Sequence, residues 1–306
     1  MSLTLHNAPD ESQDWLLSGG HEGAVLACAF ANAGSTAVSG GLDARLCIWD
    51  LAAGTNYVVE HPGRARAAIT SLQPLDKSCV AAFSDAHLAL VDLETGITLR
   101  RYTGHTRVVN QVRRAGTRHQ IASVGDDGQL LLWDAATKKP VWSTSTQFPL
   151  MTLAAADDHL VYATGLEPTI HVFDLRNISK ELFNWPTMHD DSICSIDVSP
   201  NGKLCSLGFD GQLQFYDAAT GSSRKSRYLN QCPTPNAPPN DDRYLVRCKF
   251  IHGDRYAITE GAVYDVTSQV KLADHHTAPV IDMDYHGKSN SLLMCANDGS
   301  LRVTQL

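Results

Sequence analysis

The chain has 306 residues, of which 43% are hydrophobic and 19% are charged, so it can bury a large core. Its formal net charge of -8, from 25 basic and 33 acidic side chains, does not suit a general nucleic-acid binder, because phosphate affinity depends on clustered Lys and Arg. No stretch approaches the roughly 18 apolar residues of a membrane span, and the first residues lack the apolar core of a secretory signal.

Residues 1–12 are polar and are expected to form a flexible N-terminal tail. From residue 13 onward, a short apolar pattern that ends in aspartate recurs at intervals of 40–48 residues. It reads CIWD, ALVD, LLWD, HVFD, QFYD and AVYD, ending at Asp50, Asp92, Asp134, Asp174, Asp217 and Asp265, and a seventh unit ends in RVTQL. A period of about 40–45 residues ending in Trp-Asp is typical of WD40 repeats, each a four-stranded propeller blade. We therefore predict an all-β fold, a single seven-bladed WD40 β-propeller over residues 13–306.

The predicted ring needs one strand from outside the repeats. The seventh unit stops at its third strand, whereas Trp15-Leu16-Leu17 precedes the first unit. A propeller protects the edges of its sheets by closing into a ring. We therefore expect residues 15–17 to supply the fourth strand of the last blade, beside Leu301 and Val303.

Two other features of the sequence concern loops and cysteines. Residues 230–242 are rich in Pro and Asn and are predicted to form a loop rather than a strand, either an arm that contacts a partner or a tolerated insertion. None of the eight cysteines forms a C-x-x-C motif, and most lie in apolar runs. This pattern indicates buried thiols in a reducing compartment rather than disulfides or zinc ligands.

The segment Gly125-Asp126-Asp127-Gly128 could begin a calcium loop or form a tight turn. A calcium loop needs further oxygen ligands and a late glutamate, and the LLLW that follows supplies neither. An aspartate recurs at the equivalent place in other units, which favours a structural turn. His275, His276 and His286 also lack a carboxylate or cysteine at the spacing of a metal site. We expect neither a metal nor a cofactor.

Histidine, serine, aspartate and tryptophan recur at matching spacings and could be mistaken for a catalytic triad. A catalytic site occurs once, whereas this set repeats with the blade period, so we predict a structural hydrogen-bond network and no enzyme activity. Unit five has Tyr216 in place of the tryptophan. The predicted network residues are His21, Ser39, Asp43, Trp49, His105, Ser123, Asp127, Trp133, His189, Ser206 and Asp210.

Propellers present partners with rigid loops, so residues beside the turn aspartates and around the channel mouth are candidates for binding. Several of these positions carry apolar, aromatic or arginine side chains, which are typical of interface hot spots. The alternative is that the aromatic residues plug the channel and the leucines pack beneath loops. The candidate partner-binding residues are Leu42, Arg66, Phe148, Leu166, Phe209 and Tyr244.

Beyond the repeats, the run from Leu17 to Phe30, the Gly104-His105-Thr106 segment and Val172-Phe173-Asp174-Leu175-Arg176 resemble one family. This is the 40 kDa WD40 subunit of the spliceosomal U5 small nuclear ribonucleoprotein (snRNP). The similarity is diffuse but extends over nearly the whole chain, with blades two and six differing most. It implies a nuclear, non-catalytic scaffold for pre-mRNA splicing that docks, as a single propeller, on the large central splicing factor of U5, a pre-mRNA-processing factor, and on other snRNP proteins.

An alternative is a WD40 adaptor of another complex, such as a ubiquitin-ligase substrate receptor or a signalling β-subunit. Any contact with RNA is expected to be minor. The one basic concentration lies on strands whose side chains alternate between faces, and we expect it to form a solvated rim. Its members are Arg100, Arg101, Arg107, Arg113, Arg114 and Arg118.

Overall fold

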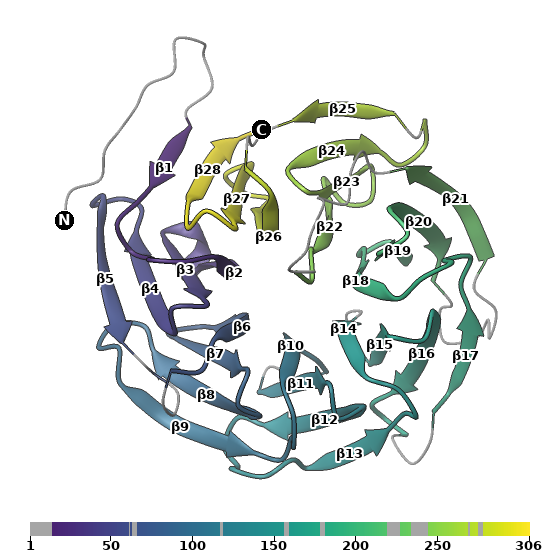
Figure 1. The fold of residues 1–306 in the computed structure, drawn as a ribbon, viewed down its shortest axis with the longest axis horizontal. Helices are drawn as coiled ribbons and strands as arrows, with labels where there is room; N and C mark the ends of the chain where they lie inside the picture. Colours follow the sequence, from purple (N-terminus) through teal and green to yellow (C-terminus); the bar gives the residue numbers. More distant parts are fainter. Residues whose placement is uncertain are drawn as a thin grey trace.

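The computed structural model describes residues 14–60, 62, 66–116, 119–155, 159–177, 181–218, 227–233, 244–268, 270–274 and 278–306. Seven four-stranded antiparallel sheets radiate around a central channel, and successive sheets follow the chain around the ring (Figure 1). The prediction of an all-β, seven-bladed propeller is therefore confirmed. The predicted tail, residues 1–12, lies outside the described residues. Among those that are described, no helix has the length and apolar character needed to span a bilayer.

The first four blades each use consecutive strands, ordered from the channel outward. Blade one contains β2 (Val25–Ala31), β3 (Thr36–Gly41), β4 (Arg45–Asp50) and β5 (Thr55–Glu60), with a single 3₁₀ turn, η1 (Asn32–Gly34). Blade two contains β6 (Ile69–Leu75), β7 (Ser78–Phe83), β8 (His87–Asp92) and β9 (Thr98–Thr103). Blade three contains β10 (Val109–Arg114), β11 (Gln120–Gly125), β12 (Gln129–Asp134) and β13 (Trp142–Ser145). Blade four contains β14 (Leu150–Ala155), β15 (Leu160–Gly165), β16 (Thr169–Asp174) and β17 (Phe183–Pro186).

The last three blades complete the ring. Blade five contains β18 (Ile193–Val198), β19 (Lys203–Gly208), β20 (Gln212–Asp217) and β21 (Arg227–Pro233). Blade six contains β22 (Cys248–Ile251), β23 (Tyr256–Thr259), β24 (Ala262–Asp265) and β25 (Lys271–Asp274). Blade seven contains β26 (Val280–His286), β27 (Ser291–Ala296), β28 (Leu301–Gln305) and, from the other end of the chain, β1 (Trp15–Leu17).

The N-terminal strand closes the ring as predicted. Trp15 pairs with Val303 and Leu17 pairs with Leu301, both in antiparallel register. Leu17 is fully buried in a cluster that also contains Trp49 of blade one. The strand therefore covers the outer edge of blade seven and also fastens that blade to its neighbour.

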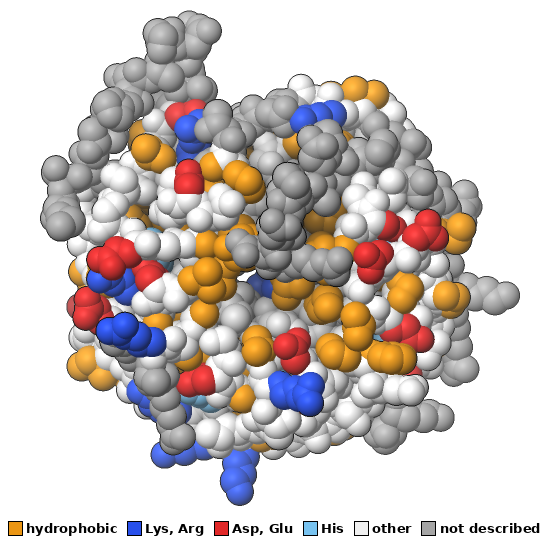
Figure 2. Space-filling view, viewed as in Figure 1, with side chains coloured by type: hydrophobic (Ala, Val, Ile, Leu, Met, Phe, Trp, Pro, Cys, Tyr) orange, Lys and Arg blue, Asp and Glu red, His pale blue; other side chains and the backbone are white. Residues whose placement is uncertain are grey.

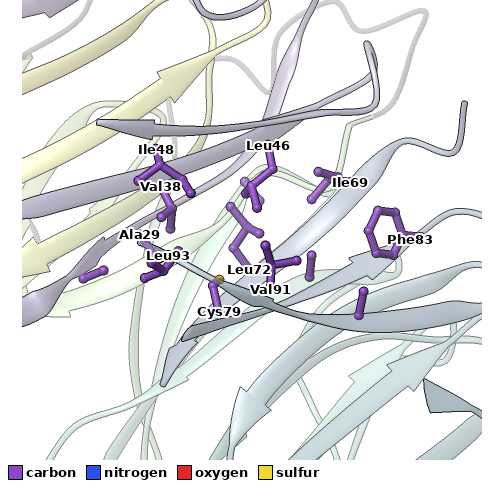
Figure 3. Close-up of a cluster of buried hydrophobic side chains, with 14 of the residues drawn as sticks. Ala29, Val38, Leu46, Ile48, Ile69, Leu72, Cys79, Phe83, Val91 and Leu93 are labelled. Carbon is purple, nitrogen blue, oxygen red and sulfur yellow. The ribbon is translucent and has the colours of Figure 1, made fainter. Parts of the chain in front are cut away.

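The hydrophobic core is divided among the interfaces between blades. Among the described residues, the buried side chains fall into seven clusters, each shared by two adjacent blades. Figure 3 shows the cluster between blades one and two, where Ile48 and Val38 face Leu72 and Cys79. Because both faces of each sheet are covered by neighbours, each blade depends on the next one for its core.

Polar side chains connect the innermost strands to one another around the channel. The inner edge of each sheet leaves backbone N–H groups without a strand partner, and several of these donate to a side chain of a neighbouring blade. The Gln111 carbonyl accepts the N–H of Leu153 at 2.7 Å. The Asp284 carboxylate likewise accepts the N–H of Phe30 at 2.8 Å, across the junction where the ring closes.

Some details of the sequence-based expectations need correction. The start of the Pro-rich segment, residues 230–233, is the end of β21 and pairs with β20, so it is not a loop. Outermost strands tolerate polar residues and proline because one of their edges faces away from the sheet. Most of the segment, residues 234–242, lies outside the described residues. Seven of the eight cysteines, all except Cys232, have described side chains, and these seven are buried and free, as the sequence indicates.

Candidate functional site

The face of the propeller that carries the Gly-His loops is held by a hydrogen-bonded chain in blades one and three. In blade three, the indole N–H of Trp133 donates to the Ser123 hydroxyl at 2.8 Å, and Ser123 lies 2.7 Å from His105 Nε2. His105 Nδ1 then contacts both oxygens of Asp127 at 3.0 Å. Because Nδ1 meets only a carboxylate, it carries the ring proton, and Nε2 accepts the serine hydroxyl.

Blade one contains the same series of hydrogen bonds between the same types of atom. Trp49 donates to Ser39 at 2.9 Å, Ser39 lies 2.8 Å from His21 Nε2, and His21 Nδ1 lies 3.0 Å from Asp43. Asp43 also accepts the backbone N–H groups of Glu22 and Arg45. These hydrogen bonds therefore connect the third strand, the second strand, the loop before the first strand and the turn between the second and third strands.

The turn aspartates stay ionised in these blades. Burial opposes the charge of the Asp127 carboxyl, but hydrogen bonds from His105 and from the N–H of Thr106 outweigh it and lower its pKa. The same balance lowers the pKa of Asp43 and of Asp210. Each carboxylate has a fully buried histidine side chain as its partner, and the same pairing occurs in three blades.

Blade five keeps the histidine, serine and aspartate but replaces the tryptophan. His189 lies 2.8 Å from Ser206 and 2.9 Å from Asp210. The Tyr216 hydroxyl donates to the Gln214 side chain, which also accepts the backbone N–H of Met188 at 3.2 Å. Gln214 therefore connects the third strand to the loop that precedes this blade.

Three of the six predicted binding residues are apolar and exposed on this face. The exposed fractions are 50% for Leu42, 38% for Phe148 and 45% for Leu166. Arg66 is also exposed, and it lines a depression of about 510 Å³ together with Leu42, Glu22 and Glu60. Tyr244 is half-buried, and Phe209 is half-buried against the cluster shared by blades five and six. The structure therefore leaves Leu42, Phe148, Leu166 and Arg66 as the accessible members of the set.

Comparison with known protein families matches the WD domain, G-beta repeat model at residues 12–50, 96–134 and 182–217. These segments end at the aspartates that close the third strands of blades one, three and five. The chain carries WD40 repeats. The family model thus matches the blades in which a histidine, a serine and an aspartate are hydrogen bonded, while the remaining blades share the fold with fewer of the repeat's polar residues.

Parts of the chain are similar to several known proteins. A segment of 164 residues is 33% identical to the pre-mRNA-splicing factor cwf17 of Schizosaccharomyces pombe and covers 52% of this chain and 47% of that protein. Another of 150 residues is 28% identical to histone acetyltransferase type B subunit 2 of Candida glabrata, covering 46% of this chain and 36% of that protein. A third, of 238 residues, is 25% identical to the protein groucho of Drosophila melanogaster, covering 76% and 31%. The matches span about half or less of the length of these relatives.

The WD40 blades also present residues that sequence reasoning missed. Met188, with an exposed fraction of 65%, lies on the same face in the loop before the histidine of blade five. The sequence could have predicted Met188 as a residue of this face, because it directly precedes His189 and the loop before the histidine is part of the repeat. Figure 2 shows this face, with hydrophobic side chains gathered over β14–β16 beside the channel.

A buried arginine crosses the channel and was not foreseen. Arg247 donates to the backbone carbonyls of Met151 at 3.3 Å, Cys194 at 3.1 Å and Asn110 at 2.8 Å, which belong to three other blades. Burial lowers the pKa of Arg247 to about 10. Arg113 also faces inward, where its charge acts on Asp282, so this member of the basic run is not part of a solvated rim. The reason is that β10 lines the channel.

Proposed function

We propose that this protein is a non-catalytic scaffold in pre-mRNA splicing. The observation that carries the proposal is the 33% identity to a pre-mRNA-splicing factor over 164 residues, on a propeller whose repeated His, Ser and Asp residues are used in structural hydrogen bonds. In the finer form suggested by sequence resemblance, the protein is a nuclear component of the U5 snRNP and docks on its large central splicing factor. It uses the face that carries Leu42, Arg66, Phe148 and Leu166.

The physical basis for a scaffold is the rigidity of this face. The loops that carry the exposed residues are fixed by hydrogen bonds to neighbouring loops and turns, so little conformational entropy is lost on binding. The Leu42 N–H, for example, donates to the carbonyl of Ala24 at 3.0 Å, and the Leu166 N–H donates to that of Pro149 at 3.1 Å. Exposed apolar side chains on rigid loops favour binding to another protein over binding to nucleic acid.

Affinity purification of the tagged protein from its own nuclear extract tests this function. We expect U5 RNA and the large splicing factor to remain bound at moderately high salt, as identified by RNA blotting and mass spectrometry. Replacement of Phe148 and Leu166 by glutamate is expected to release them, whereas the same change at Ile97 and Leu99, which are exposed at the start of the outermost strand of blade two, is the matched control. Recovery of ubiquitin-ligase or signalling subunits without U5 would overturn the proposal and favour the adaptor alternative.

A further inference from the structure

Three consecutive loops of blades three to five form one continuous apolar surface. They carry Phe148, Leu166 and Met188, with exposed fractions of 38%, 45% and 65%. The Leu166 N–H donates to the Pro149 carbonyl at 3.1 Å, and Thr187 donates to the Pro168 carbonyl through its N–H at 2.9 Å and its hydroxyl at 2.8 Å. These bonds place each loop directly beside the next one. Large exposed apolar side chains that adjoin one another are uncommon outside interaction sites.

The loops that form this surface are acidic, and Arg107, in the loop that precedes blade three, lines a depression beside Phe148. The loops at residues 146–149, 166–168, 187–192 and 209–211 are all described, and they contain no Lys or Arg. They contain four carboxylates, those of Glu167, Asp190, Asp191 and Asp210. Asp210 pairs with His189, which leaves Glu167, Asp190 and Asp191 exposed beside the apolar side chains. Figure 2 shows acidic side chains alongside the hydrophobic ones on this side of the channel.

Blade one provides an internal contrast on the same face. Its exposed carboxylates, Glu22 and Glu60, both lie near Arg45, at 2.9 and 3.6 Å. Arg45, together with Arg66 in the same depression, therefore balances these two negative charges. The loops that carry the exposed carboxylates of blades four and five provide no Lys or Arg of their own. A binding partner gains most where its charges meet opposite charges that have not been neutralised.

We propose that the surface formed by Phe148, Leu166, Met188, Glu167, Asp190 and Asp191 binds a basic, apolar segment of a partner protein. The aliphatic or aromatic side chains of that segment pack against Phe148, Leu166 and Met188. Its Lys or Arg side chains pair with the three carboxylates. This inference rests on the proposed function in one respect, namely that the protein works by binding partners, and it specifies the chemistry of the partner.

Selection from a phage-displayed library of random short peptides tests the inference without assuming a partner. We expect the enriched peptides to carry a net positive charge and at least one aliphatic or aromatic residue. A variant with Glu167→Lys, Asp190→Lys and Asp191→Lys is expected to bind those peptides about tenfold more weakly or worse, because three attractive charges become repulsive. The matched control, Asp76→Lys, Glu94→Lys and Asp217→Lys, makes the same charge change at exposed positions on the strand ends opposite the Gly-His loops. It is expected to bind within about twofold of the parent.

Several results would overturn the inference. These are the absence of enriched peptides, enrichment of acidic or neutral peptides, or an equal loss of binding in the control variant. Loss of self-association in the first variant, measured by sedimentation, would assign the surface to a second copy of the chain instead. Circular dichroism melts of both variants establish that they fold. A negative result in the peptide experiment would not contradict the proposed splicing function, because co-purification with U5 RNA is measured separately.

Discussion

Blades one, three and five differ from blades two and four at one buried position of the second strand. The first group has Ser39, Ser123 and Ser206 there, and the second group has Ala81 and Ala163. All five side chains are fully buried. Blade six has Thr259 at this position, and its hydroxyl donates to the backbone carbonyl of Arg247 at 3.0 Å. In all three serine blades the hydroxyl is hydrogen bonded to the histidine of the preceding loop, and in blades one and three it also accepts the indole N–H of the third-strand tryptophan. These bonds fix the loops within the blade. In the alanine blades this connection is missing, and the blades depend more on their neighbours.

The alternation of the two kinds of blade has a physical consequence. Each alanine blade has a serine blade on at least one side, and its buried side chains join a cluster with that neighbour. The internal order of one blade can therefore support the next, as expected for a fold in which neighbours share a core. The segments that match the WD40 family model end in the three serine blades.

Blade seven is the extreme case, since it borrows a strand, and removing that strand should have the largest effect. Deletion of residues 1–17 exposes the edge of β28 and removes the fully buried Leu17. We expect the free energy of unfolding to fall by more than about 3 kcal/mol, because the burial of Leu17 and part of Trp15 is lost. Urea denaturation followed by circular dichroism measures this, with a chain that begins at residue 14 as the control. Equal stability of the two chains would contradict the closure of the ring by β1.

Loss of a network histidine should be more harmful than loss of an exposed one. His105→Leu leaves the buried Ser123 hydroxyl and Asp127 carboxylate without their partner, and we expect a loss of about 3 kcal/mol. His171→Leu in blade four removes a partly exposed pair with Glu181 and should cost less than about 1 kcal/mol. Urea denaturation of both variants provides the comparison. Similar losses of stability in the His105→Leu and His171→Leu variants would show that the hydrogen-bonded network does not make blade three more dependent on its histidine than blade four.

Exchange of serine and alanine between the two kinds of blade tests the contrast in both directions. Ser123→Ala leaves His105 and the Trp133 indole without the hydroxyl and should cost about 2 kcal/mol. Ala163→Ser places a hydroxyl in a fully buried site opposite His171, whose ring already pairs with Glu181, and should cost about 1 kcal/mol. Thermal denaturation measures both. A stabilised Ala163→Ser variant would mean that blade four can build the same connection.

The turn carboxyls should respond to pH in opposite ways in blades five and six. The pKa of Asp210 is lowered, so the stability it provides is complete above its unfolded pKa of about 3.9 and is lost as the pH falls through the folded value. In blade six, burial raises the pKa of Glu260 to about 7. The folded state therefore binds this proton more tightly, and stability decreases as the pH rises from about 4.3 to 7.

Two neutral variants separate these effects. Glu260→Gln should raise stability at pH 8 by about 1 kcal/mol, since solvent partly screens this half-exposed carboxylate, and should leave stability near pH 4 unchanged. Asp210→Asn should destabilise the protein at pH 7, with a smaller difference at pH 3. Urea midpoints measured across this pH range test both. A flat difference between parent and Glu260→Gln would contradict the raised pKa.

The propeller architecture can be predicted from the amino-acid sequence, because the repeated aspartates and the repeated His-Ser-Asp spacings are local and periodic signals. The spacing of Asp50, Asp92 and Asp134 reports the length of a blade, and a last unit one strand short requires a strand such as residues 15–17. The matching spacings of His21, Ser39 and Asp43 likewise follow from the geometry of one blade. Contacts within a blade repeat, so a single sequence displays them several times.

The contacts between residues of different blades could be identified only from the three-dimensional structure. The Arg247 guanidinium donates to the backbone carbonyl of Asn110, which lies 137 residues earlier in the sequence. This contact across the channel does not recur with the blade period, so the repeat pattern cannot predict it. Phe209 is aromatic, as interface hot-spot residues often are, but its side chain packs against the hydrophobic cluster shared by blades five and six. Met188 joins Leu166 and Phe148 because neighbouring loops are hydrogen bonded side by side. Such contacts depend on how the ring packs, and packing between blades is set by side-chain shapes that repeat only loosely along the chain.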